Sequence, residues 1–168
     1  MKAICTALLF ATILVGCTET TEPTGFANPV TVNMTFPNSW VVTTPPAPIV
    51  YTATSIDGLD DEFLDIANVV VEDIPPTGWT LFIAASEVAL STLFDDLTVD
   101  SSASAEVIGL RAQRMILTYT VEGVEVQALQ YFIEAGSEAI SISFATEKAS
   151  FNGKLAEFES IVATLALS

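Results

Sequence analysis

Histidine is absent from this sequence of 168 residues, and cysteine occurs only twice, at Cys5 and Cys17. Without histidine, the chain lacks the most common general base and the usual nitrogen ligand for zinc. Serine hydrolases that use a Ser-His-Asp triad and thiol enzymes that use a Cys-His pair are therefore excluded. Zinc sites built from several cysteines and histidines are excluded for the same reason.

Basic residues are also scarce, because five lysines and arginines face 21 acidic residues and the formal net charge is −16. Nucleic acids and anionic lipid headgroups are bound through patches of lysine and arginine. This charge balance excludes nucleic acid as a partner. The composition is nevertheless 51% apolar, which indicates a packed domain and not a disordered acidic tail.

The first residues form a basic start followed by an apolar run from Ala3 to Val15. The run is too short to span a bilayer as a permanent helix and is typical of a secretory signal. It ends in Leu14-Val15-Gly16-Cys17, the pattern of a bacterial lipoprotein lipobox. We predict cleavage between Gly16 and Cys17 and attachment of a diacylglycerol to the Cys17 sulfur. The alternative is an ordinary signal peptide in which the cysteine is incidental.

Cleavage at this position divides the chain into three parts. Residues 1–16 are the signal peptide, residues 17–29 are the lipidated cysteine with a flexible Thr/Pro-rich tether, and residues 30–168 are the folded domain. The domain then contains no disulfide and no thiol, because Cys5 is removed and Cys17 is acylated. Thr18 occupies the position where an aspartate favours the inner membrane in enteric-type sorting. We therefore expect a lipid anchor in the bacterial cell envelope, in the periplasmic leaflet of the outer membrane.

Alternating apolar and polar residues predict strands along most of the domain. The expected strands are 30–36, 40–43, 49–55, 68–74, 105–108, 115–121, 124–133 and 139–145. The strands 115–121 and 124–133 flank Glu122-Gly123, which is the two-residue spacing of a tight hairpin. With the strand 139–145 they form a three-stranded antiparallel meander.

Two segments predict helices. Residues 80–96 contain no helix breaker, and their broad apolar surface predicts a helix that is covered on more than one side. Residues 148–165 carry an apolar stripe spaced four and three residues apart, which predicts one face packed on a sheet. The stripe consists of Phe151, Leu155, Phe158, Val162 and Leu165. The fold class predicted from these elements is α+β, an antiparallel sheet flanked by α-helices.

Three blocks of the sequence resemble the PsbP-like superfamily, and most closely its bacterial DcrB-type lipoprotein and periplasmic branch. The blocks are Val32-Asn33-Met34-Thr35-Phe36-Pro37-Asn38-Ser39-Trp40, Asn68-Val69-Val70-Val71-Glu72, and the segment from Arg114 to Ala145, which the closing helix follows. The resemblance spans roughly Val30 to Leu167. It implies an α/β/α sandwich and an accessory or protein-interaction role. Relatives bind photosystem complexes or a small GTPase, so the resemblance transfers neither a partner nor any site residue.

Two acidic stretches stand out, and the first of them is a candidate cation site. The denser one is Asp57-Gly58-Leu59-Asp60-Asp61-Glu62 with Asp65, and the other contains Asp95, Asp96 and Asp100. Closely spaced carboxylates suit Ca²⁺, but the spacing of the first stretch does not fit an EF-hand loop. A solvated loop is favoured there, with a Ca²⁺ site as the alternative. The second stretch is expected at a helix end and turn.

The tryptophans and the arginines have structural interpretations. Trp40 and Trp79 are expected in packing and not as platforms for a ligand. Arg111 and Arg114 lie three residues apart, so on a strand they point to opposite faces and do not form an anion clamp.

The sequence therefore favours an accessory domain of the cell envelope that is anchored through lipid on Cys17 and binds another envelope protein. We predict no catalytic residues, no metal and no cofactor. The alternative is an envelope lipoprotein that binds Ca²⁺ or a small ligand through the Asp57 to Asp65 loop. A weaker third hypothesis is carboxylate-based hydrolysis, which needs two acids held across a cleft.

Overall fold

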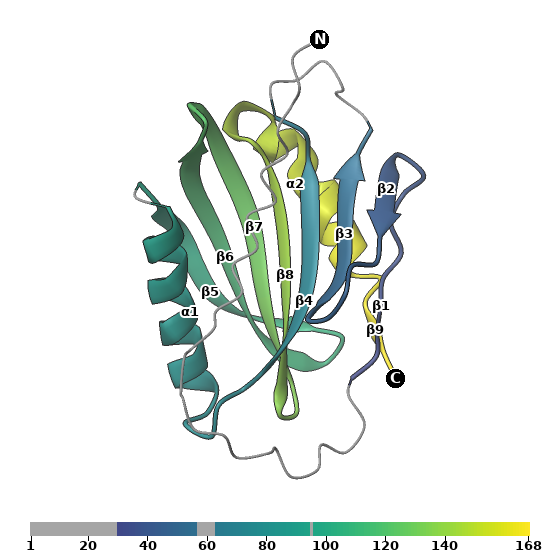
Figure 1. Cartoon of the computed structure of the whole chain (residues 1–168), viewed down its shortest axis with the longest axis vertical. Coiled ribbons are helices and arrows are strands. Elements are labelled where there is room, and N and C mark those ends of the chain that lie inside the picture. Colours follow the sequence, from purple (N-terminus) through teal and green to yellow (C-terminus); the bar gives the residue numbers. More distant parts are fainter. Residues whose placement is uncertain (1–29, 57–62, 95) are drawn as a thin grey trace.

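The computed structural model describes residues 30–56, 63–94 and 96–168 (Figure 1). Its centre is a seven-stranded antiparallel sheet with the strand order β2-β3-β4-β8-β7-β6-β5. The strands are β2 (Trp40–Thr43), β3 (Ile49–Ser55), β4 (Ile66–Asp73), β5 (Thr98–Val107), β6 (Leu110–Val121), β7 (Val124–Ala135) and β8 (Glu138–Glu147). Helices α1 (Trp79–Leu93) and α2 (Lys148–Val162) cover opposite faces of the sheet. The predicted α+β fold is confirmed.

The strands β5 to β8 follow one another in the chain and lie side by side in the sheet. The predicted hairpin joins β6 to β7, with Val121 opposite Val124. Glu122 and Gly123 both have positive φ, at 51° and 88°, as a two-residue turn of this hand requires. The turn fixes the register of the whole hairpin.

Helix α2 packs through one apolar face on β7 and β8. Phe151, Phe158 and Ile161 are buried there. The ring of Phe158 stacks on Phe144 of β8, with ring centroids 4.9 Å apart. The helix and its buried face therefore match the prediction, although the helix ends at Val162 and the last residue of the stripe, Leu165, is buried beyond it.

Helix α1 packs on the opposite face through Trp79 and Phe82. The expectation that this helix is covered on more than one side is wrong. Leu81 and Val88 lie on its outer side and are 56% and 66% exposed. Among the described residues, no element packs against that side, so its apolar residues face solvent.

The prediction for two strands needs correction. The expected strand 30–36 is reduced to β1 (Val32–Asn33), which pairs with β9 (Ala166–Leu167) and is extended by two backbone hydrogen bonds between Thr31 and Ser168, although burial alternates through the whole segment. The strand expected to start at residue 105 begins at Thr98. Nearly all of β5 is exposed on both faces, so its sequence lacks the alternation by which a half-buried strand is identified.

Within the three described ranges, no helix has both the length and the apolar character that crossing a membrane requires.

Candidate functional site

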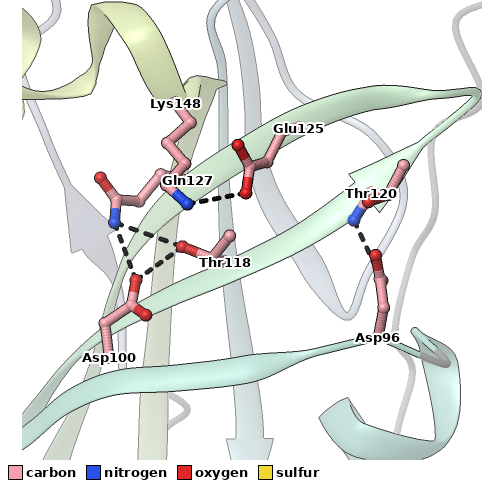
Figure 2. Close-up of polar contacts among 7 residues, drawn as sticks. All are labelled: Asp96, Asp100, Thr118, Thr120, Glu125, Gln127 and Lys148. Carbon is pink, nitrogen blue, oxygen red and sulfur yellow. Dashed lines mark hydrogen bonds and ion pairs between the residues drawn. The ribbon is translucent and has the colours of Figure 1, made fainter.

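A polar surface covers the end of β5, β6 and β7 on the side of the sheet that carries α2. Helix α2 packs on β7 and β8, which leaves side chains of β5 and β6 on this side accessible. We call this region the carboxylate surface (Figure 2). It consists of Asp96, Asp100, Thr118, Thr120, Glu125, Gln127 and Lys148.

Asp100 lies at the centre of the carboxylate surface, where the register of β5 shifts between Val99 and Ser101. Figure 2 shows its carboxylate pointing towards β6 and β7. Its Oδ2 atom accepts hydrogen bonds from the Thr118 hydroxyl at 2.6 Å and from Gln127 Nε2 at 2.8 Å. Both donors are neutral, so they orient the carboxylate; its negative charge acts on Lys148 and contributes to raising the pKa of that lysine.

Asp96 and Lys148 lie on either side of this centre. Asp96 Oδ1 accepts a hydrogen bond from the Thr120 N–H at 3.1 Å, and hydrogen bonds from the Thr120 side chain and backbone lower the pKa of Asp96. Lys148 Nζ contacts Glu125 Oε1 at 2.7 Å, and this hydrogen bond raises the pKa of Lys148. Both groups therefore stay charged at neutral pH.

This arrangement suits binding better than proton transfer. A general acid or base works best when its pKa lies near the operating pH, whereas the pKa of Asp96 moves away from neutrality. Across residues 30–56, 63–94 and 96–168, no three histidine, cysteine or acidic side chains are grouped so that they could hold a metal ion. The carboxylate surface can present negative charge and hydrogen-bond acceptors to a partner.

We predict that Thr120→Ala raises the pKa of Asp96 towards its ordinary value without restoring it fully. The substitution removes the side-chain hydrogen bond, which is the larger cause, and keeps the backbone donor. A carboxyl carbon NMR titration of wild-type and variant protein measures both values. An unchanged Asp96 titration would show that the hydroxyl does not contribute.

Every basic residue of the described part of the chain forms an ion pair with a carboxylate of the same chain. The pairs are Arg111 with Glu134 at 3.4 Å, Arg114 with Glu159 at 2.9 Å, Lys148 with Glu125 at 2.7 Å and Lys154 with Asp65 at 2.9 Å. The positive charges are thus used within the domain. The remaining carboxylates dominate the field outside it.

The structure locates only part of the predicted site residues. Gly16 and Cys17 of the lipobox, the loop residues 57–62 and Asp95 lie outside the described residues. Asp65, the last acid of the proposed Ca²⁺ loop, is buried, and its Oδ2 atom is held by Lys154. Asp96 lies in the turn after helix α1, as expected, whereas Asp100 lies in strand β5 and not in a turn; both belong to the carboxylate surface.

The interpretations of the tryptophans and arginines are confirmed. Trp40 and Trp79 are each 6% exposed and belong to the two cores. Arg111 lies over the ring of Trp79 at 5.8 Å, on the face that carries α1. Arg114 reaches Glu159 of α2 on the other face.

Sequence reasoning missed Thr118 and Gln127. The signal was present, because a hairpin that turns at Glu122-Gly123 places Thr118 directly opposite Gln127. The third member, Asp100, could not be found in this way, since its position depends on the irregular register of β5.

Glu72 is a half-buried acid on the face that carries α1. Burial raises the pKa of Glu72, although a hydrogen bond from Ser141 lowers it in part. Ionisation of Glu72 therefore opposes folding. Below the unfolded pKa of about 4.3 the carboxyl group is protonated in both states and costs no stability. As the pH rises through the higher pKa of the folded state, this stability is lost. We expect Glu72→Gln to raise the melting temperature at pH 7 and to have little effect at pH 3. A lower melting temperature for the variant at pH 7 would contradict this.

The fold is shared with solved structures from several bacteria. LpqN, described as involved in cell envelope biogenesis of Mycobacterium tuberculosis, has a TM-score of 0.67 and 11% identity, over 86% of this chain and 87% of that chain. The cyanobacterial PsbP protein (CyanoP) from Synechocystis has a TM-score of 0.61 and 11% identity, over 91% of this chain and 100% of that chain. A Pseudomonas aeruginosa protein of unknown function has a TM-score of 0.55 and 11% identity, over 83% and 84% of the two chains.

At this identity the likeness establishes the fold, which is PsbP-like, and does not establish a shared function. No family model matches the chain, and no curated protein sequence matches it.

Proposed function

We propose that this chain is a lipid-anchored accessory protein of the bacterial cell envelope, which acts by binding another envelope protein and catalyses no reaction. The observation that carries the proposal is the distribution of charge. Each described basic side chain is paired with a carboxylate of the same domain, while Asp96 and Asp100 are oriented by neutral donors. Such a surface attracts a cationic partner and repels an anionic one.

The sequence and the fold each support this proposal. The Leu14-Val15-Gly16-Cys17 pattern is that of a lipoprotein processing site, and Cys17 would carry the lipid. LpqN, which has the same fold, is described as involved in cell envelope biogenesis. We also propose that the protein belongs to the DcrB-type branch. Its expected location is the periplasmic leaflet of the outer membrane, which Thr18 favours.

Two experiments test the two halves of this proposal. The first compares the native protein with a Cys17→Ser chain that is exported by an ordinary cleavable signal peptide. We expect the native protein in the membrane fraction, because two or three acyl chains give stable attachment. The processed variant has no cysteine to acylate, so we expect it in the soluble fraction. A processed variant that stays in the membrane would contradict the anchor.

The second experiment is immunoprecipitation of the lipidated protein from detergent-solubilised envelopes, followed by mass spectrometry. We expect one dominant envelope protein, and the Cys17→Ser chain is the control for capture through lipid alone. Reproducible hydrolytic activity of the purified protein that one carboxylate substitution abolishes would overturn the non-catalytic assignment.

The alternative of a Ca²⁺-binding lipoprotein depends on acids at residues 57–62, which lie outside the described residues. Titration calorimetry with Ca²⁺ decides this alternative. Absence of binding at millimolar Ca²⁺ would remove it.

A further inference from the structure

The strand β5 is one edge of the seven-stranded sheet, and within the described part of the chain it pairs with β6 alone. In Figure 1, β5 lies at the edge of the sheet that is nearest to α1. It is ten residues long, and residues 98–104 are exposed at every position. An edge of this kind presents a row of backbone N–H and C=O groups that can pair with another extended chain.

The opposite edge strand, β2, has features that hinder pairing with another chain, and the sequence of β5 lacks them. The strand β2 has only four residues, and Pro45, Pro46 and Pro48 follow it. Proline cannot donate to a ladder, and short edge strands are a common protection against unwanted pairing. The strand β5 contains neither proline nor lysine, and its register runs without a break from Ser101 to Val107.

The side chains along β5 leave space for a second strand. Residues 101–105 are Ser, Ser, Ala, Ser and Ala, so this stretch of β5 itself places no large side chain at the edge. Two acids bracket this stretch. Asp100 faces the carboxylate surface, with Thr118 and Gln127, and Glu106 lies opposite Arg111, which is on the α1 face.

The charges distinguish between two possible occupants of this edge. Pairing two β5 strands would join two acidic edges, because each copy carries Asp100 and Glu106 and has no lysine or arginine in β5, and such a like-charge contact is unfavourable. Arg111 does not relieve this, because it forms an ion pair with Glu134 at 3.4 Å. A strand with two basic residues would instead find a carboxylate at each end.

We propose that β5 is a docking edge for an extended basic segment of an envelope protein, which adds an eighth strand to the sheet. This proposal rests on the proposed function and specifies its partner. Backbone pairing along residues 101–106 provides the affinity, and Asp100 and Glu106 select a segment whose two lysines or arginines lie five positions apart. The odd spacing places the two basic side chains on opposite faces of the added strand, as the two acids require.

The test uses the lipidated full chain in detergent and a capped synthetic peptide, Thr-Lys-Val-Thr-Val-Thr-Lys-Thr. The control peptide has glutamate in place of both lysines. We expect the lysine peptide to bind and to slow hydrogen exchange in β5, and the glutamate peptide not to bind. No binding, equal binding of both peptides, or protection confined to other strands would overturn the proposal.

Two variants with the same change of charge make the test specific. Glu106→Lys is expected to weaken binding of the lysine peptide about tenfold. Asp73→Lys changes an exposed acid at the end of β4, which is separated from β5 by three strands, and is expected to change binding less than about twofold. Equal effects of the two variants would show that only net charge matters and would overturn the assignment to β5.

Sedimentation and immunoprecipitation separate this proposal from the others. A dimer that Glu106→Lys or a proline at Ser104 disrupts would identify a second copy as the occupant and overturn the basic-segment proposal. If the Glu106→Lys chain still captures the same envelope protein in full yield, the docking edge is wrong while the accessory function stands. If neither chain captures a partner, the proposed function itself fails.

Discussion

Replacing Phe158 with alanine is expected to lower the free energy of unfolding by about 3–5 kcal/mol. The Phe158 side chain is completely buried between α2 and the sheet. Its ring stacks on Phe144 at 4.9 Å and meets Trp40 and Phe151 edge-on, at 6.2 Å and 6.5 Å. Alanine would remove the apolar contacts and leave a cavity that these rigid neighbours cannot fill.

Val88→Ala is the matched control for this prediction, because it also truncates an apolar side chain on a helix. Val88 is on the outer side of α1 and is largely exposed, so its truncation is expected to change stability by no more than about 0.5 kcal/mol. Urea denaturation followed by circular dichroism measures both values. A large loss for Val88 with a small loss for Phe158 would mean that α1, not α2, covers the main core.

The sequence identified α2 and its buried face because period and burial agree there. Phe151, Phe158 and Val162 repeat at helical spacing, and all three are buried. For α1 the same reasoning failed on the outer side. Apolar residues such as Leu81 and Val88 occur all round that helix, and periodicity does not reveal which of two apolar sides a sheet will cover.

The edge of the sheet was the hardest part to predict. In a strand with one buried face, apolar and polar residues alternate along the sequence. The strand β5 has solvent on both faces, so its sequence from Thr98 to Ser104 resembles a polar loop. The candidate site depends on this same strand. Thr118 and Gln127 were within reach of sequence reasoning through the hairpin, whereas the position of Asp100 depends on the bulge beside Val99.

The second large effect is expected at the ion pair between Lys154 and Asp65. Lys154→Met is expected to lower the free energy of unfolding by about 3–5 kcal/mol, as is usual when one partner of a buried pair is removed. Asp65 is only 4% exposed. Its Oδ2 atom contacts Lys154 Nζ at 2.9 Å and has no other hydrogen-bond partner among the residues that the structure describes. The variant would leave a carboxylate buried and uncompensated.

A double variant separates the value of the pair from the cost of breaking it. Asp65→Leu combined with Lys154→Met removes both charges, and it is expected to recover most of the stability that Lys154→Met loses, since apolar substitutes for a buried ion pair are often neutral or stabilising. Chemical denaturation of the wild type, both single variants and the double variant gives the coupling energy.

The result also bears on the partner. If Lys154→Met costs less than about 1 kcal/mol and no coupling is found, Lys154 is not required by the fold. It would then count as a cation at the surface, and the inference that the domain uses its basic residues internally would fail for that residue. A strong coupling, in contrast, means that Lys154 compensates a carboxylate which the fold has buried. Lys154 is then unavailable to an anionic partner, and the acids along β5 dominate recognition at the edge of the sheet.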